Sequence, residues 1–199
     1  FPEEKSTSRG LKAPSSLTTS LCGSKRKNHF NGVVAVMERF LTLLKPNLLV
    51  LGEKDWQQLV ILRQLVKTLN LPIQIRGVAT VRSPEGLALS SRNKLLNPTE
   101  LSEALSVPKL LSLAAQNAKK GLVPDLKSLQ VNLEKQRLKV EYLETVDPFS
   151  LQPVQTNQNL CLLAAAVHCG STRLIDHIFL MKRKPIVAID GPAGAGKST

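Results

Sequence analysis

Residues 48–58, LLVLGEKDWQQ, decide the fold class of this chain. The apolar run 48–51 closes on Gly52, which is typical of a short parallel strand that is buried on both faces. Apolar residues then recur with helical spacing over 56–69, and a second strand is expected at 73–78. Strand, helix and strand in this order form a βαβ unit, so the sequence predicts an α/β fold with a parallel sheet.

The turn between the first strand and the helix is the first candidate site. Ligands of βαβ units bind outside the carboxyl ends of the strands, which places Gly52, Glu53, Lys54 and Asp55 where a nucleotide would bind. Asp55 can also cap the helix that follows it. The charges in this turn therefore have a structural as well as a functional interpretation, and taken alone they do not separate the two.

The chain before this unit is predicted to contain one loop and one helix. Residues 1–32 are rich in Ser, Thr, Lys and Gly and are expected to be loop. The helix after them should end at Pro46. Its apolar face is predicted to consist of Val33, Val36, Met37, Phe40, Leu41 and Leu44.

A second module is expected after a turn at 83–86. The segment 97–100, NPTE, combines a cap residue, a Pro at the first helical position and a Glu that can bond back to the cap, so it predicts a helix start. Two helices followed by three β-rich runs make this module α+β. The helices are predicted at 99–120 and 125–138, and the β-rich runs at 139–146, 159–167 and 172–179.

The last residues carry the strongest single motif. Residues 185–190 read as a short apolar strand, and 191–199, GPAGAGKST, match the pattern G-x-x-x-x-G-K-[ST] directly after it. In such a P-loop, backbone N–H groups surround phosphate, Lys197 neutralises its charge and the Ser198 hydroxyl binds Mg²⁺. The predicted phosphate loop is Gly191, Pro192, Ala193, Gly194, Ala195, Gly196, Lys197, Ser198 and Thr199.

Composition makes some classes of function less favoured. The formal net charge is +12, but outside 25–27 and 182–184 the basic residues are dispersed, and aromatic residues make up only 4% of the chain. A basic surface that attracts ATP is therefore favoured over nucleic-acid binding, which needs clustered cations and stacking platforms. The longest apolar runs, such as 160–167, are too short for a membrane span.

The cysteines and histidines suggest no metal site. Cys22, Cys161 and Cys169 form no Cys-x-x-Cys pair, and the three histidines never fall at metal-ligand spacing. We therefore expect the cysteines to be small hydrophobic residues in a reducing cytosol.

Three segments, in their order and spacing, resemble the signature segments of pantothenate synthetase. They are 52–59, GEKDWQQL, then 86–93, GLALSSRN, then 172–176, TRLID. Residues 185–199 resemble the start of cytidylate kinase, and a bifunctional family joins these two enzymes in this order. The resemblance implies an incomplete Rossmann-like nucleotidyltransferase domain at 1–86, a smaller α+β C-terminal domain of the synthetase at 87–182 and the start of a P-loop kinase at 183–199.

The resemblance also implies a reaction. The pantoate carboxylate would attack the α-phosphate of ATP with loss of pyrophosphate, and the amine of β-alanine would then displace AMP from pantoyl-adenylate to give pantothenate. The implied catalytic residues are Lys54, Ser90, Ser91 and Arg92, because fixed cations and donors contribute most where charge builds in a water-poor site. Gln58 would bind pantoate. The implied ATP-binding set is Gly52, Glu53, Lys54, Asp55, Val81, Leu89, Ser90, Ser91 and Arg92, with Asp55 at the ribose hydroxyls and Val81 at the adenine.

The chain departs from the pattern of this family in two places. Arg26 and His29 fall in a loop where the family has Arg-Pro-Gly-His-Phe-Asp, and here Lys27, Asn28 and Asn31 replace the Pro, Gly and Asp. A substrate contact and a loop-anchoring role both stay open for His29. The HIGH-like segment and the second pantoate-binding glutamine of the family are not among these residues, so the fragment alone is not expected to have full synthetase activity.

The resemblance implies ATP and Mg²⁺ as cofactors, small-molecule substrates (pantoate, β-alanine and CMP or dCMP), a homodimer and a cytoplasmic location. Two alternatives stay open. A P-loop nucleoside monophosphate kinase with an accessory domain would form ADP as its only nucleotide product. A basic nucleic-acid-binding module would bind RNA with a steep salt dependence.

Overall fold

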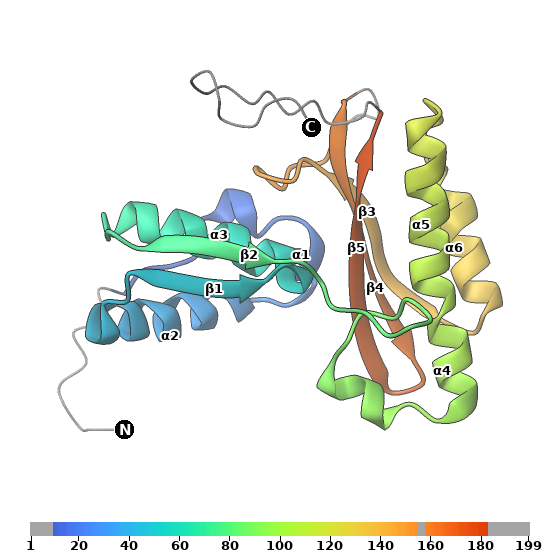
Figure 1. The fold of residues 1–199 in the computed structure, drawn as a ribbon, viewed down its shortest axis with the longest axis horizontal. Coiled ribbons are helices and arrows are strands. Elements are labelled where there is room, and N and C mark those ends of the chain that lie inside the picture. The colour runs from blue at the N-terminus through green and yellow to red at the C-terminus, as the bar shows by residue number, and fades with distance from the viewer. Residues whose placement is uncertain (1–9, 155–157, 183–199) are drawn as a thin grey trace, which may run out of the picture.

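The computed structural model describes residues 10–154 and 158–182, which form two units that lie side by side (Figure 1). The first unit contains the 3-10 helices η1 (Ser15–Leu17) and η2 (Glu53–Asp55), the helices α1 (Leu21–Lys25), α2 (His29–Leu44) and α3 (Trp56–Thr68), and the strands β1 (Leu48–Gly52) and β2 (Gln74–Val78). The second contains η3 (Ser91–Leu95), α4 (Pro98–Ala104), α5 (Ser106–Lys119), α6 (Leu126–Lys135), β3 (Lys139–Val146), β4 (Leu160–Cys169) and β5 (Thr172–Met181).

The βαβ unit predicted from the sequence is confirmed. Strands β1 and β2 pair in parallel, from Leu48 opposite Gln74 to Gly52 opposite Val78, and α3 connects them. The prediction that β1 is buried on both faces is wrong, since Leu48 and Val50 are 43% and 52% exposed. Leu49 and Leu51 on the other face pack into the core, so within the described residues this two-stranded sheet is covered on one face only.

The segment before β1 is more helical than expected. Residues 1–32 were expected to be loop, but α1 and the first turn of α2 fall within them. The buried face of α2 consists of Phe30, Val34, Glu38 and Leu41. The predicted apolar face is right for Leu41 and for Val33 and Met37, which pack against the core, but wrong for Val36, Phe40 and Leu44, which are exposed. The helix is apolar on most of its circumference, so its sequence alone does not show which side is buried. The buried side is the one that packs against α3.

The second unit is an antiparallel sheet with helices on one face. Its strand order is β3-β4-β5, with α5 packed on β5 and α6 on β3. Along β4 the side chains alternate between two cores, as strand geometry requires. Leu163, Ala165 and Val167 join the core beneath α5 and α6, whereas Leu162 and Ala164 join the core of the first unit. The sheet is therefore the shared wall between the units (Figure 1).

The helix predicted at 99–120 is two helices, which corrects the prediction. The break lies at Leu105, the residue between α4 and α5. Pro108 lies in the first turn of α5, where it has no N–H to donate to the Ala104 carbonyl and its ring would clash with that carbonyl in a continuous helix. The capping box at Asn97 and Glu100 is confirmed, with both reciprocal hydrogen bonds at 2.9 Å.

The remaining elements follow the predicted pattern with shifted ends. Asp125 caps α6 by accepting from the N–H groups of Lys127 and Ser128, but the helix ends at Lys135 rather than at 138. Strand β3 has the predicted bounds, and β4 and β5 run two residues further, to Cys169 and Met181. No helix in the described part of the chain is long and apolar enough to cross a membrane.

Candidate functional site

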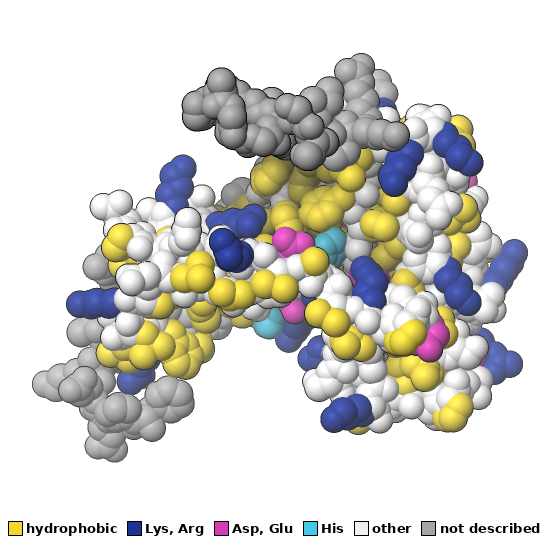
Figure 2. All heavy atoms as spheres, viewed as in Figure 1, with side chains coloured by type: hydrophobic (Ala, Val, Ile, Leu, Met, Phe, Trp, Pro, Cys, Tyr) yellow, Lys and Arg dark blue, Asp and Glu magenta, His cyan; other side chains and the backbone are white. Residues whose placement is uncertain are grey.

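A cavity of about 240 Å³ lies where the two units meet. Figure 2 shows acidic, basic and histidine side chains gathered at this junction. The first unit contributes the region around α1 and the turn after β1, and the second unit contributes η3 and one face of its sheet. The polar side chains that line the cavity are Cys22, Arg26, His29, Lys54, Asp55, Gln57, Gln58, Arg92, Tyr142, Arg173, Asp176 and His177.

Lys54 connects the turn after β1 to the second unit. Its Nζ donates a hydrogen bond to the Leu89 carbonyl at 3.0 Å. Burial lowers the pKa of Lys54, and the nearby Arg92 lowers it further, against the opposing effects of Asp55 and Asp176. The side chain is thus a partly desolvated cation on the cavity wall, and such a cation interacts strongly with an anion that enters the cavity.

The segment between Val81 and Leu89 forms a closed loop beside this lysine. The Leu89 N–H donates to the Val81 carbonyl at 2.9 Å, and an isolated bridge pairs Arg82 with Ala88. Gly86 turns the chain with a φ of +99°, a conformation that favours glycine. The residues expected to contact ATP on this loop are therefore set by backbone pairing and not by a flexible tip.

Arg82 fixes this loop to the sheet of the second unit. Its Nη1 and Nη2 donate to the two carboxylate oxygens of Asp176 at 2.7 and 2.8 Å, and Nη1 also donates to the Gly86 carbonyl at 3.0 Å. Asp176 is only 6% exposed, and its Oδ1 accepts from the His177 N–H as well. A two-pronged ion pair of this kind fixes orientation as well as distance.

The 3-10 helix η3 presents Arg92 to the cavity. The Ser90 side chain caps η3 by accepting from the Arg92 N–H at 3.2 Å. Asn93 donates from its side chain to the Ala88 carbonyl at 3.1 Å and ties η3 to the loop before it. Ser90 thus has an observed structural role, that of orienting the residue two positions later.

Arg26 and His29 lie on the first-unit side of the cavity. Arg26 Nη1 lies 3.0 Å from His29 Nε2, and because arginine only donates, Nε2 is the acceptor. Burial lowers the pKa of His29, with smaller contributions from the positive charges of Arg26 and Arg173. His29 is therefore held in its neutral form at lower pH than an ordinary histidine.

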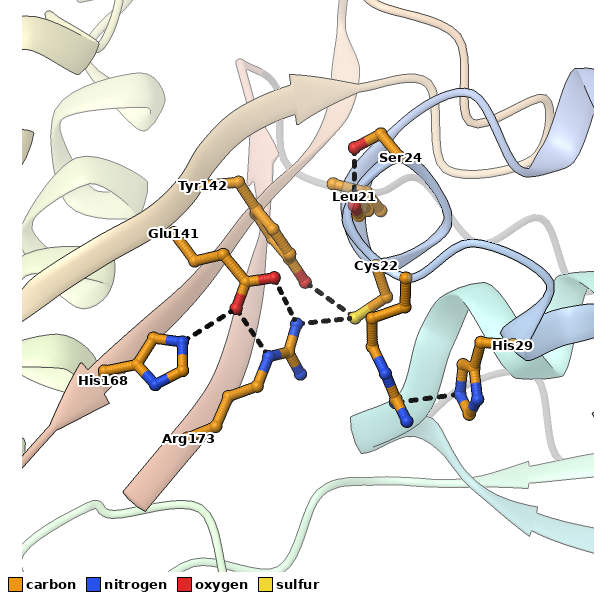
Figure 3. A network of polar contacts seen from close by, with 9 residues as sticks. Leu21, Cys22, Ser24, His29, Glu141, Tyr142, His168 and Arg173 are labelled. Atoms are coloured by element: carbon orange, nitrogen blue, oxygen red, sulfur yellow. Dashed lines mark hydrogen bonds and ion pairs between the residues drawn. The ribbon is translucent and has the colours of Figure 1, made fainter. Parts of the chain in front are cut away.

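Arg173 is the centre of a polar network on the opposite wall (Figure 3). Its Nε and Nη2 donate to the Glu141 carboxylate at 2.7 and 3.2 Å, and Nη2 also donates to the Cys22 thiol at 3.4 Å. Cys22 Sγ in turn lies 3.3 Å from the Tyr142 hydroxyl, and His168 Nε2 lies 3.2 Å from Glu141. Cys22 is half-buried and packs against the core, as expected of a small hydrophobic residue, but its thiol also contacts Tyr142 and Arg173, which that expectation did not include.

The cavity brings together part of the predicted set. Lys54, Asp55, Arg92 and Gln58 line it, as does His29. Leu89 contributes its carbonyl to Lys54. Gly52, Glu53, Val81, Leu89, Ser90 and Ser91 are not among its lining residues, and Val81 and Leu89 are 63% and 50% exposed. The predicted P-loop residues, 191–199, lie outside the described residues.

Several residues of the shared sheet line the cavity although no sequence pattern assigned them a role. Arg173, Ile175 and His177 alternate along β5 and so share the face towards the first unit, with Tyr142 on β3. The segment 172–176, TRLID, is part of the family resemblance. The alternation of side chains along β5 places Arg173 on a cavity wall only when β5 is paired with its neighbouring strand and the first unit is packed against the sheet. Trp56 marks that docking, since its Nε1 donates to the Pro148 carbonyl at 2.6 Å and its ring meets Phe179 edge-on at 4.9 Å.

No metal cage is present in the part of the chain that the structure describes. Residues 10–154 and 158–182 contain no group of three or more His, Cys, Asp or Glu side chains that could hold a metal ion. Ser198, the predicted Mg²⁺ ligand, lies outside those ranges. Of the two cavity carboxylates, Asp176 is already paired with Arg82.

Known proteins resemble this chain along nearly its whole length. The family described as Pantoate-beta-alanine ligase matches residues 2–179. A "Bifunctional pantoate ligase/cytidylate kinase" from Prochlorococcus marinus (strain MIT 9303) is 57% identical over 199 residues, which is 100% of this chain and 41% of that protein. A protein of the same description from Parasynechococcus marenigrum (strain WH8102) is 54% identical over 199 residues, which is 100% of this chain and 38% of that protein. The chain therefore spans about two fifths of these curated relatives.

Solved structures show the same fold. Pantothenate synthetase from Thermus thermophilus superposes with a TM-score of 0.76 at 31% identity, over 84% of this chain and 62% of that one. Pantoate-beta-alanine ligase from Francisella tularensis, complexed with beta-gamma ATP and beta-alanine, gives a TM-score of 0.69 at 30% identity over 88% of this chain and 59% of that one. With a family match that covers most of its residues and an α/β fold shared with these enzymes, the chain belongs to the pantoate-beta-alanine ligase family.

Proposed function

We propose that this chain forms the larger part of the active site of an ATP-dependent ligase that joins pantoate to β-alanine. The observation that carries the proposal is the junction cavity, in which Lys54, Arg92 and Gln58 converge from separate elements. Membership of the ligase family supports the reaction class. The Francisella tularensis relative, whose structure holds an ATP analogue and β-alanine, supports these two as substrates.

The proposed chemistry proceeds in two steps. A carboxylate oxygen of pantoate attacks the α-phosphorus of ATP, the bond to the bridging oxygen breaks and pyrophosphate leaves. The amine of β-alanine then attacks the acyl carbon, loses a proton and displaces AMP, which keeps the oxygen that came from pantoate. Lys54 and Arg92 neutralise the negative charge that builds on the leaving pyrophosphate.

The other residues of the proposed site, in the cavity and beside it, bind and orient the substrates. Gln58 is half-buried at the start of α3 and offers an amide to the hydroxyls of pantoate. Asp55 accepts from the ribose, and the backbone from Gly52 onwards lies against the nucleotide. Ser90 and Ser91 complete the phosphate contacts from η3, while Val81 covers the adenine.

Mg²⁺ enters this proposal with the nucleotide. Magnesium is usually held by one or two carboxylates together with substrate phosphates. The described residues offer Asp55 at the cavity and no acidic cluster, so the phosphates of ATP would be the main ligands and no step here depends on a protein-bound ion.

The finer organisation is proposed with it. The names of the curated relatives support a fusion to cytidylate kinase, whose P-loop would be 191–199 and whose acceptor would be CMP or dCMP. We place domain boundaries at 86 and 182, and we propose a cytoplasmic homodimer. Gel filtration with light scattering would test the dimer.

The test of the reaction uses a chimera in which these 199 residues replace the equivalent segment of the 57% identical Prochlorococcus relative. The chimera is incubated with Mg-ATP together with either pantoate and β-alanine or CMP, and nucleotides are separated by chromatography. Formation of AMP, pyrophosphate and pantothenate supports the proposal. Formation of ADP alone, and only with CMP, would favour a kinase with an accessory domain. No nucleotide product together with salt-sensitive RNA binding would favour a nucleic-acid-binding module.

A further inference from the structure

The junction cavity contains two separate groups of cations. Lys54 and Arg92 form the first group, since Arg92 lies close enough for its charge to lower the pKa of Lys54. Arg26 and Arg173 flank His29 and form the second group, since both of their charges lower its pKa. All five residues line the same cavity, yet Arg173 is not among the charges that act on Lys54.

The two groups are separated along strand β5. His177, beside the Lys54 end, and Arg173 are four residues apart on the same face of this strand. At about 3.3 Å per residue their Cα atoms are roughly 13 Å apart. A phosphate that contacts Lys54 therefore leaves Arg173 available to a second anion.

Arg173 is prepared to bind an anion. Burial lowers the pKa of Arg173, but the interactions of its guanidinium with Glu141 and Cys22 together outweigh burial and raise it. Glu141 and Cys22 occupy Nε and Nη2 and so fix the plane of the guanidinium, as Figure 3 shows. Among the described residues Nη1 has no hydrogen-bond partner, so the two N–H groups of this nitrogen, on a rigid and permanently charged guanidinium, are left for a ligand.

The proposed reaction identifies the anion. The carboxylate of pantoate must point at the α-phosphate, and once the adenylate has formed it is no longer ionised. The only free carboxylate among the substrates is then that of β-alanine, which two methylene groups separate from the attacking amine. An amine aimed at the acyl carbon places its carboxylate on the far side, away from the phosphate-binding cations.

We propose that Arg173, held by Glu141, binds the carboxylate of β-alanine and thereby selects the amine that attacks the adenylate. Arg26 adds positive charge at the same end of the cavity. Cys22 on α1 accepts a hydrogen bond from the guanidinium, and the Tyr142 hydroxyl contacts the Cys22 thiol in turn. This inference rests on the proposed function, because it assigns the second substrate of the same site.

The test compares two amines in the chimera defined above. One is β-alanine and the other is its amide, 3-aminopropanamide, which keeps the amine and the chain length but lacks the negative charge. The unaltered chimera should use β-alanine with a kcat/KM about tenfold to a hundredfold higher, the range expected for a hydrogen bond between charged groups. Arg173→Gln should remove most of this preference by weakening the use of β-alanine while sparing the amide.

Two further variants make the result specific. Arg173→Lys keeps the charge without the fork and should retain part of the preference. Arg137→Gln removes an arginine that is 80% exposed and paired with Glu103 only at 3.7 Å, so it should change kcat/KM for neither amine. Should the Gln variant fail to fold, the comparison of the two amines in the unaltered chimera and in the Lys variant still decides.

Pyrophosphate release with pantoate alone separates the inference from the function on which it rests. The subsite is supported if this release falls far less in Arg173→Gln than the use of β-alanine does. It is overturned if the unaltered chimera does not discriminate between the amines, or if the variant lowers the use of both amines and pyrophosphate release equally. No pyrophosphate release by the unaltered chimera would contradict the proposed function itself, and the subsite with it.

Discussion

Lys54 and Arg92 are the two cations proposed to neutralise the leaving pyrophosphate, and they come from different units, one from the turn after β1 and one from η3. Lys54→Ala and Arg92→Ala in the chimera should each lower pantoate-dependent pyrophosphate release about a hundredfold or more, because each removes one fixed charge at the point where negative charge develops. Single-turnover assays with labelled ATP would measure this.

The matched controls are lysines nearby that do not line the cavity. Lys67 lies in the last turn of α3, the helix that follows Lys54, and Lys94 lies in η3 together with Arg92. The variants Lys67→Ala and Lys94→Ala should both release pyrophosphate at the unaltered rate. If Lys54→Ala and Arg92→Ala behaved like these controls, both residues would be surface charges and the site would have to be sought elsewhere.

The pH dependence follows from the burial of Lys54. Its pKa is lowered from the ordinary value, so the ammonium loses its proton at lower pH than an exposed lysine does. Pyrophosphate release should therefore decline as pH rises through that lowered pKa. Lys54→Arg keeps its charge up to about pH 12 and should extend activity to higher pH, even if its maximal rate is lower. Coincident alkaline limbs in the pH–rate profiles of the two proteins would contradict this.

The loop from Val81 to Leu89 depends on the ion pair that anchors it to β5. Asp176 is nearly buried and pairs with Arg82 through two hydrogen bonds. Asp176→Asn should lower the free energy of unfolding by about 2 kcal/mol, between the values for exposed and for fully buried pairs. Urea unfolding of the 199-residue chain would measure it through the fluorescence of Trp56, the one tryptophan of the sequence, which packs between the units.

The exposed pair of Arg137 and Glu103 provides the comparison. Arg137→Ala should change the free energy of unfolding by less than about 1 kcal/mol, because solvent screens that pair. Equal effects of the two substitutions would mean that Arg82 does not hold the loop to the sheet.

At the level of elements, the sequence predicted what local chemistry determines. The βαβ unit, the Asn97 capping box and the bounds of β3 were correct because periodicity and cap residues specify them locally. The break at Leu105 was missed although Pro108 signals it, since a proline in the first turn of a helix is also an ordinary helix start. Half of the predicted face of α2 is exposed because its partner α3, and not its own sequence, selects the face that is buried.

Pattern alone predicted the candidate site only on its first-unit side. Lys54 and Asp55 follow a strand and so could be placed at its carboxyl end, whereas Gln58 and Arg92 were implied only by the family resemblance. Arg173 and Tyr142 reach the same cavity only because the antiparallel sheet docks against the first unit. That contact joins segments far apart in the sequence, which no local pattern encodes.

In the whole molecule, the first unit leaves apolar surface uncovered. Leu48 and Val50 on β1 and Leu43 and Leu44 on α2 are 43% to 70% exposed, and Figure 2 shows hydrophobic side chains gathered over that part of the unit. Exposed apolar patches promote association. The isolated chain should therefore show a sedimentation coefficient that rises with concentration.

Substitutions on the two units test whether this surface causes the association. Leu43→Lys combined with Leu44→Lys should reduce the concentration dependence in sedimentation velocity experiments. Leu122→Lys, at an exposed leucine of the second unit that is 56% accessible, should leave it unchanged. A chain that stays monomeric at every concentration would show that the uncovered face is not adhesive.

In the proposed reaction, the carboxylate of pantoate attacks the α-phosphate of ATP in the junction cavity. To test this, the chimera is supplied with pantoate labelled with ¹⁸O in its carboxylate, together with Mg-ATP and β-alanine, and the products are analysed by mass spectrometry. Attack at the α-phosphate should place one ¹⁸O in the phosphate of AMP and none in pyrophosphate. Label in inorganic phosphate, accompanied by ADP, would mean attack at the γ-phosphate and would overturn the proposed reaction.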